Sequence, residues 1–167
     1  MSEYFNTEHN IATITANFPE YDELLGFFIH TLKLKKYDIY IAGGAIRDAL
    51  LGRQPKDVDI FICTDYIYER SAIIKALSGF NEIQILPNYY HDETHEYSNI
   101  DLLINGKKIQ LMNDCVNNTL PSLISRFDYN ICQYGYYKCS DEVITTEGAK
   151  VLMSALQVME VSPLDFL

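Results

Sequence analysis

The 167-residue sequence predicts an α+β fold in which helices pack on a mixed, mainly antiparallel sheet. Stretches with apolar residues at helical spacing alternate with short runs rich in β-branched and aromatic residues, the pattern of interleaved helices and strands. Two of these runs are joined by Asn105-Gly106, a dipeptide typical of a two-residue β-hairpin. With 48% hydrophobic residues the chain can bury one core, so we expect a single domain at residues 17–167 after a flexible segment at residues 1–16.

The first half of the chain begins with a helix and a strand. Asn17 is a good N-cap, Pro19 suits the first turn, and apolar residues then recur at helical spacing as far as Leu32. Residues 37–42 are rich in strand-forming side chains, and the glycine pair Gly43-Gly44 ends the run.

Two further helices and two further strands follow the glycine pair. Good helix formers cover residues 45–51 and stop at Gly52, the usual position of a left-handed residue after a helix. We expect the next strand at residues 57–63, a helix at residues 65–77 and a third strand at residues 82–86.

The hairpin around Asn105-Gly106 fixes its own register. Its strands are residues 99–104 and 107–112, and a two-residue type I′ turn determines how they pair. The predicted pairs are Ile104 with Lys107, Leu103 with Lys108, Leu102 with Ile109 and Asp101 with Gln110. Asp101 and Gln110 should therefore be neighbours on one face of the sheet.

The last third of the chain predicts two more helices around a second hairpin. A short helix at residues 120–127, with Pro121 at its start, leads into a tyrosine-rich strand at residues 129–136. The hairpin returns through residues 143–145, and a final helix covers residues 147–159.

Charge and composition argue against several functions. The 13 basic and 23 acidic residues give a net charge of −10, which disfavours a broad grip on nucleic acid, so any RNA contact must be local or come through a partner protein. No apolar run approaches the ~20 residues of a membrane span, and the polar N-terminus lacks a signal-peptide pattern, so we expect no membrane partner and a cytoplasmic location. The four cysteines are spaced too widely for a zinc site: Cys63, Cys115, Cys132 and Cys139.

Asp57 and Asp59 form the most informative pair of side chains. In an extended strand alternate residues share a face, so both carboxylates point the same way and repel unless a cation lies between them. The Gly43-Gly44 turn lets backbone N–H groups approach an anion. Together these features indicate a phosphate held next to a divalent metal ion.

Two runs of sequence resemble motifs of a known family. Residues 43–60 read Gly-Gly-Ala-Ile-Arg-Asp-Ala-Leu-Leu-Gly-Arg-Gln-Pro-Lys-Asp-Val-Asp-Ile, and residues 126–132 read Arg-Phe-Asp-Tyr-Asn-Ile-Cys. Both resemble, at the expected separation, the head domain of tRNA nucleotidyltransferases and poly(A) polymerases, a branch of the polymerase-β-like nucleotidyltransferase superfamily. The likeness covers about residues 20–155 and implies the polymerase-β-like nucleotidyltransferase fold.

The resemblance implies a role for each matching residue. Asp57 and Asp59 would be catalytic and would bind Mg²⁺ or Mn²⁺, with an NTP as substrate. Eight residues would lie at the nucleotide: Gly43, Gly44, Arg47, Asp48, Lys56, Arg126, Asp128 and Asn130. For Asp48 and Lys56, support of the helix and ordering of the loop are an equally good interpretation.

The sequence departs from the family at the third carboxylate. Superfamily members usually carry it on a neighbouring strand, where this chain has the neutral amide Gln110. Asp101, opposite Gln110 in the hairpin, is a candidate third metal ligand; if Gln110 fills the position instead, two carboxylates alone would give slow catalysis or none. In the second motif Phe127 replaces an arginine and Cys132 replaces an asparagine, which leaves ribose recognition open.

His91 and His95 lie among acidic residues in a polar loop and resemble a metal-binding cluster. No helix aligns the two imidazoles, so a solvated acidic loop is the better interpretation.

The sequence therefore predicts a nucleotidyltransferase that moves NMP from an NTP to a hydroxyl acceptor and releases pyrophosphate. An RNA 3′ end, a protein side chain and a small alcohol all remain open as acceptors. The chain stops soon after the head-like region, so we expect the helical region that grips tRNA in full-length enzymes to be missing. The alternatives are a catalytically reduced nucleotide-binding or partner-binding module and a minimal protein nucleotidyltransferase.

Overall fold

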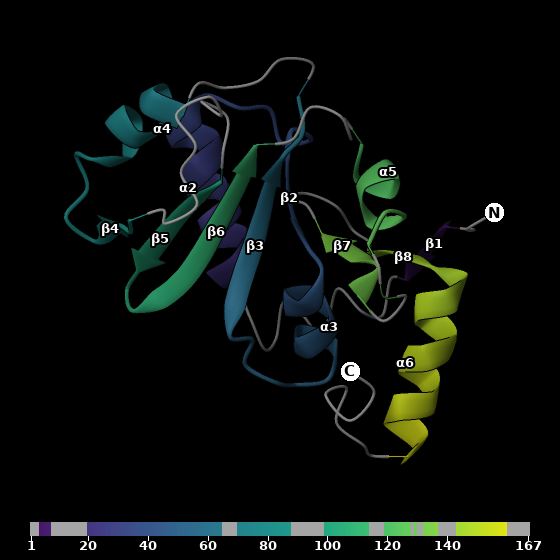
Figure 1. Ribbon diagram of the computed structural model, residues 1–167. Helices are drawn as coiled ribbons and strands as arrows, with labels where there is room; N and C mark the ends of the chain where they lie inside the picture. The colour runs from purple at the N-terminus through teal and green to yellow at the C-terminus, as the bar shows by residue number, and fades with distance from the viewer. Residues whose placement is uncertain are drawn as a thin grey trace.

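The computed structural model describes residues 4–7, 20–64, 70–87, 99–113, 119–127, 129, 132–136 and 143–159. The α+β class is confirmed, and the helices and strands are drawn in Figure 1. In chain order they are β1 (Tyr4–Thr7), α2 (Glu20–Leu32), β2 (Ile39–Ala42), α3 (Gly44–Leu50), β3 (Asp57–Ile62), α4 (Arg70–Leu77), β4 (Ile83–Ile85), β5 (Ile100–Ile104), β6 (Lys107–Asn113), α5 (Leu120–Ile124), β7 (Tyr134–Tyr136), β8 (Val143–Thr146) and α6 (Glu147–Met159).

One mixed sheet organises the described chain, with strand order β1-β8-β7-β2-β3-β6-β5-β4. Neighbouring strands are antiparallel except β3 and β6, which run parallel in the centre. A parallel pair needs a long crossover, and here α4, β4 and β5 supply it. The crossover brings the start of β3 beside the start of β6 (Figure 1).

The two faces of the sheet differ in what covers them. On one face the alternate β3 residues Val58, Ile60 and Ile62 are fully buried in the main core, which also contains the inward sides of α2, α3 and α4. On the other face α5 packs through Leu120, Leu123 and Ile124 on a smaller cluster that includes Phe61. This smaller cluster lies toward the C-terminal end of β3. The beginning of β3, where the aspartates lie, is therefore less covered.

The structure confirms the predicted hairpin. Asn105 has φ +51° and Gly106 has φ +80°, the positive values that both central residues of a type I′ turn require. The four predicted pairs, from Ile104–Lys107 to Asp101–Gln110, are all present. A local turn signal was enough because turn type and strand register are coupled within the hairpin.

Other elements differ from the prediction at their ends. The final helix has the expected bounds, but among the described residues of the strand expected at 129–136 the part that forms a strand is β7, from Tyr134 to Tyr136. The helix expected at residues 120–127 is shorter because Arg126 N–H and Phe127 N–H bond to carbonyls three residues back, which tightens its last turn. Of the helix expected at residues 65–77, the described part is α4.

β1 is a strand that no sequence pattern predicts. It lies within residues 1–16, where we expect a flexible segment, and pairs with β8 near the other end of the chain. Such pairing joins residues more than 130 positions apart, so no local signal specifies it. The boundary of the single domain at residue 17 stays a prediction.

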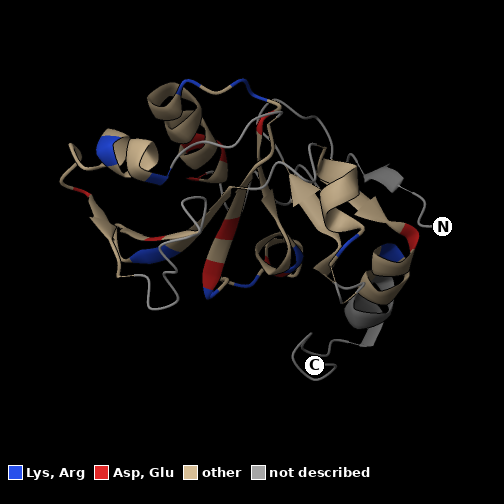
Figure 2. Ribbon diagram, turned by 45° about the horizontal axis from the view of Figure 1, so that its top comes forward, with Lys and Arg blue, Asp and Glu red and all other residues tan. Residues whose placement is uncertain are grey.

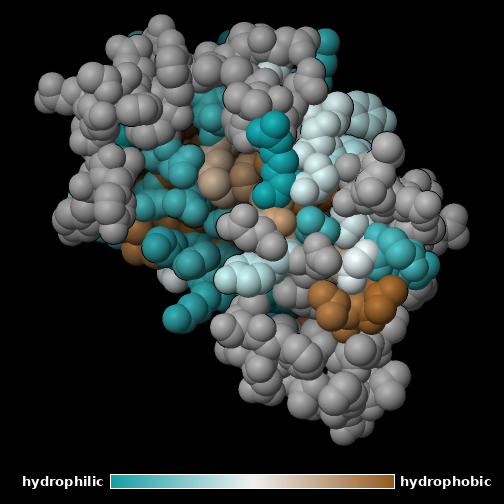
Figure 3. Space-filling view, turned by 45° about the vertical axis from the view of Figure 1, so that its right-hand side comes forward, coloured by the Kyte–Doolittle hydropathy of each residue, from teal (hydrophilic) through white to brown (hydrophobic). Residues whose placement is uncertain are grey.

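α6 leaves hydrophobic side chains on the surface. Ala149 and Met153 face the core, whereas Val151 and Leu152 are exposed. Figure 3 shows a hydrophobic patch on this side of the molecule. None of the described helices is long and apolar enough to cross a membrane.

Candidate active site

The carboxylate pair lies at the beginning of the central strand β3. Val58, between the two aspartates, points into the core, so Asp57 and Asp59 share the opposite face. Asp57 is exposed and Asp59 is half-buried. Figure 2 shows the acidic positions of β3 in red at the start of the strand. Burial of Val58 and Ile60 in the core therefore directs both aspartates to the same face, as predicted.

Asp59 begins a row of polar side chains across three strands. It is paired with Gln110 on β6, and Gln110 is paired with Asp101 on β5. Directly paired residues point to the same face, so the three side chains lie side by side with the amide in the middle. Two strand spacings separate the backbones of Asp59 and Asp101, roughly 10 Å.

Asp101 carries an unused acceptor in this row. Its Oδ1 atom is buried and accepts no hydrogen bond from any residue in the described part of the chain. A buried carboxylate oxygen in this state costs stability unless a donor or cation reaches it. The Oδ1 atom of Asp101 is therefore the oxygen on this face that would gain most from a nearby cation.

Asp59 is held in an environment that opposes its charge. Burial, and then the neighbouring charges of Asp57 and Asp101, raise the pKa of Asp59 to about 6. Lys108 acts in the opposite direction and lowers it. Lys108 is paired with Asp57 across the parallel strands, so it lies on the same face as the carboxylates.

Lys108 is a site residue that sequence reasoning missed. The hairpin register pairs it with Leu103, but nothing in the local sequence shows that β3 lies on the other side of β6. The available signal was that Lys108 is a basic residue two positions before Gln110, and alternate residues of a strand share a face.

The chemistry of these donors suits a hard divalent cation. Mg²⁺ prefers carboxylate oxygens, and Asp57, Asp59 and the unpaired Oδ1 of Asp101 supply them on one face. As they stand, no three His, Cys, Asp or Glu side chains among the described residues lie close enough together to hold a metal ion. The donor types suit the ion, but their positions in this structure do not form a metal site, so the metal site stays a prediction.

The glycine turn joins β2 to α3 next to these strands. Gly43 has φ +88°, a conformation that side chains rarely adopt, and its carbonyl accepts the first helical hydrogen bonds from Ile46 and Arg47. Gly44 leaves room for the Arg47 side chain, since a Cβ there would lie 3.1 Å from Arg47 Nη2. Gly43 thus allows the tight turn, and Gly44 leaves the space that the Arg47 side chain occupies.

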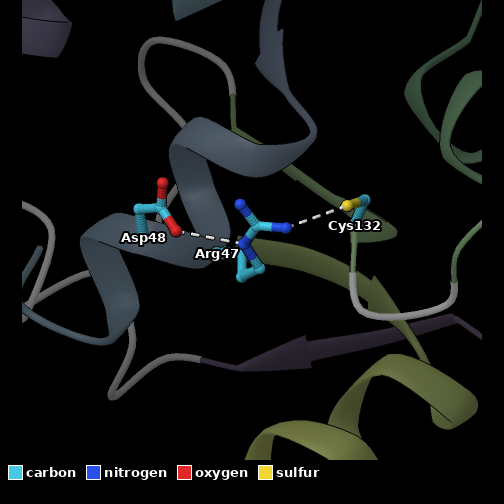
Figure 4. Close-up of polar contacts among 3 residues, drawn as sticks. All are labelled: Arg47, Asp48 and Cys132. Atoms are coloured by element: carbon cyan, nitrogen blue, oxygen red, sulfur yellow. Dashed lines mark hydrogen bonds and ion pairs between the residues drawn. The ribbon is translucent and has the colours of Figure 1, made fainter. Parts of the chain in front are cut away.

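Arg47 connects the two sequence motifs. Its guanidinium is buried, with Nε donating to Asp48 Oδ1 at 3.0 Å and Nη1 donating to Cys132 Sγ at 3.3 Å (Figure 4). Burial raises the pKa of the Cys132 thiol, while Arg47 lowers it and Asp48 raises it further, so Cys132 accepts as a neutral thiol. Asp48 is an orienting partner of Arg47, in line with a supporting role.

The second motif reaches the first through an aromatic contact. Phe127, which replaces an arginine of the family motif, packs on Phe61 with ring centroids 5.9 Å apart. A Cβ on Gly43 would lie 3.8 Å from the same ring, so Phe127 sits beside the glycine turn. Neither this contact nor the Arg47–Cys132 bond is encoded by local spacing.

The remaining predicted residues are placed only in part. Lys56 is exposed directly before β3, and Arg126 is exposed after α5. Asp128 and Asn130 lie outside the described residues, as do His91 and His95 of the acidic loop. The structure therefore places Phe127 and Cys132 of the second motif beside Gly43 and Arg47 of the first.

Solved structures confirm the expected fold. A CCA-adding enzyme in complex with ATP superposes with a TM-score of 0.64 at 18% identity, over 92% of this chain and 36% of that one. The Thermotoga maritima CCA-adding enzyme complexed with tRNA gives a TM-score of 0.61 at 16% identity, over 92% of this chain and 35% of that one. At these identities the likeness shows a tRNA nucleotidyltransferase-like head fold, and the chain spans about a third of those enzymes.

Sequence comparison identifies the family. The CCA-adding enzyme of Geobacillus stearothermophilus is 55% identical over 42 residues, which are 25% of this chain and 10% of that enzyme. A family model described as Gabija anti-defense 2 family protein matches residues 6–155, most of the chain. The chain belongs to the Gabija anti-defense 2 family.

Proposed function

We propose that this protein is a metal-dependent nucleotidyltransferase that moves NMP from an NTP to a hydroxyl acceptor and releases pyrophosphate. The observation that carries the proposal is the placement of Asp57 and Asp59 on one face of β3, in a row that ends at Asp101, whose Oδ1 has no partner among the described residues. The head fold shared with CCA-adding enzymes, which include ATP-bound and CTP-bound structures, supports it. The reaction takes place in the cytoplasm.

Asp57, Asp59 and Asp101 hold Mg²⁺ or Mn²⁺ in this proposal. A bound divalent cation supplies Lewis-acid chemistry, neutralising phosphate oxygens and activating the attacking oxygen. Asp101 contributes from β5 the charge that Gln110 on β6 lacks. Although its pKa is raised to about 6, Asp59 is still mostly ionised at neutral pH and is available to a cation.

The first motif holds the triphosphate. Gly43 and Gly44 bring backbone N–H groups toward the phosphates, and the Arg47 guanidinium, oriented by Asp48, supplies positive charge. Lys56 and Lys108 add cations at the two sides of the aspartates. Arg126, Asp128 and Asn130 of the second motif are assigned to the ribose and phosphates by resemblance to the family motif.

The family name connects the protein with the counteraction of a defence named Gabija. Nucleotidyl transfer onto a component of that defence would be a direct means of inactivating it. A net charge of −10 disfavours long RNA as the acceptor, although the tRNA complex among the solved neighbours keeps an RNA end as a candidate.

A second candidate function is a nucleotide-binding module with little or no turnover. One observation favours it: the neutral Gln110 separates Asp59 from Asp101. Activity measurements on variants of this row distinguish the two functions.

Removal of the aspartate pair tests the enzyme hypothesis. We expect wild-type protein with Mg²⁺ and one of the four α-³²P-labelled NTPs to label RNA or Gabija components. The Asp57→Ala/Asp59→Ala variant should lose at least about a hundredfold in rate, because loss of metal ligands exceeds the 10- to 100-fold effects of their outer partners. Glu147→Gln, an exposed acidic position on α6, is the charge control and should label normally. Label transfer that survives the double substitution would contradict the proposal.

The position of the third carboxylate is tested by moving it. Asp101→Asn should weaken Mg²⁺-dependent NTP binding, measured by calorimetry, by about tenfold or more. Asp101→Asn/Gln110→Glu keeps the number of carboxylates and moves the charge to β6, so it should recover most of the lost affinity. Unchanged binding in Asp101→Asn would show that Asp101 holds no metal.

The raised pKa of Asp59 predicts how stability depends on pH without metal. The folded state keeps Asp59 protonated up to about pH 6, whereas the unfolded chain ionises it near its ordinary value of 3.8. The folded state thus binds more protons between these values, so the free energy of unfolding falls as pH rises through this window. In urea titrations with EDTA, Asp59→Asn should lack this decrease and be more stable than wild type at pH 7. A constant difference between the two proteins from pH 4 to 7 would refute the assignment.

A further inference from the structure

A cavity lies on the other face of the sheet from the aspartates. It has a volume of ≈ 560 Å³ and is bounded by α2, the connection from α4 to β4, and the β5–β6 hairpin. Ile109, one of its lining residues, is the neighbour of Gln110 on β6 and therefore points away from the aspartate face. The candidate active site does not use this cavity.

The floor of the cavity is apolar and partly aromatic. Leu24, Phe27, Phe80 and Ile104 line it, and Phe80 is 37% exposed. The rings of Phe27 and Phe80 meet edge to face, with centroids 5.0 Å apart. A hollow of this size with accessible aromatic surface is suited to anchoring an apolar side chain.

The rim of the cavity is acidic. Glu20, Glu23 and Glu82 line it together with a single lysine, Lys107. Lys107 Nζ lies 3.8 Å from Glu20 Oε1, so the rim keeps an excess of negative charge at the exposed Glu23 and Glu82. Such a rim attracts cations and repels phosphates.

We propose that this groove docks a protein acceptor through a segment that presents an apolar side chain flanked by lysine or arginine. The apolar floor takes the anchor, and Glu23 and Glu82 pair with the flanking charges. RNA fits this site poorly because its phosphates would meet the glutamates. The inference rests on the proposed function and selects a protein from the acceptors left open.

The hairpin links the groove to the aspartates. Lys107 lines the groove, while the next residue, Lys108, is paired with Asp57 on the opposite face. Among the described residues, the hairpin tip at Asn105-Gly106 lies next to Lys107 and Lys108 at this end of the sheet. A segment held in the groove can therefore present a nearby hydroxyl to the aspartates around that tip.

A pair of synthetic helical peptides tests the docking. One carries a phenylalanine and leucine face flanked by lysines, and the other has every lysine replaced by glutamate. By fluorescence anisotropy, wild type should bind the basic peptide at least about tenfold tighter than the acidic one. Glu23→Lys should remove most of this preference. Phe80→Ala should weaken binding of the basic peptide although it leaves the charge of the groove unchanged.

Two variants keep this test separate from catalysis. Glu147→Lys makes the same charge reversal away from the groove and should bind the basic peptide normally. Asp57→Ala/Asp59→Ala should also bind it normally. If wild type binds the basic peptide but transfers no label from any NTP, the enzyme hypothesis fails and the docking proposal stands. Equal loss in Glu23→Lys and Glu147→Lys, or displacement of the peptide by a single-stranded RNA oligonucleotide, would overturn the docking proposal.

Discussion

Parallel pairing of β3 with β6 determines which charged side chains meet in this protein. It places Asp57 beside Lys108 and Asp59 beside Gln110, and the hairpin from β6 to β5 then adds Asp101 to the same row. The pairing depends on a buried apolar layer below it, since Val58, Ile60, Ile109 and Leu111 are in the main core. A slip by one residue would turn the aspartates into that core, where unpaired charge is very costly.

The same pairing concentrates charge that the protein alone does not balance. Asp59 is half-buried between like charges, Asp101 has a buried oxygen without a partner among the described residues, and Lys108 offsets part of the repulsion. These partly unbalanced charges lower the stability of the folded protein, which is typical of sites that bind a ligand. The opposite face of the same strands carries an apolar hollow with an acidic rim, so one hairpin separates two regions of different chemistry.

Sequence reasoning succeeded where information is local. The Asn105-Gly106 turn determined the register that nominated Asp101, and the alternation of β3 determined the common face of the two aspartates. It failed where distant segments meet. The pairing of β1 with β8, the position of Lys108 and the bond from Arg47 to Cys132 join residues between 51 and 142 positions apart, and no spacing rule predicts them. The strand expected at residues 129–136 was too long for a related reason: strand propensity extends over it, whereas the described pairs with β2 and β8 involve Tyr134, Gly135 and Tyr136.

In the proposed enzyme three carboxylates from two strands, Asp57 and Asp59 of β3 and Asp101 of β5, act together on one metal-bound nucleotide. Crystals grown with Mn²⁺ and a non-hydrolysable NTP analogue test it directly, because the anomalous signal of manganese locates the ion independently of the protein. We expect a manganese peak coordinated by oxygens of Asp57, Asp59 and Asp101 together with the phosphates. A nucleotide bound with manganese on its phosphates alone, or bound away from these aspartates, would contradict it.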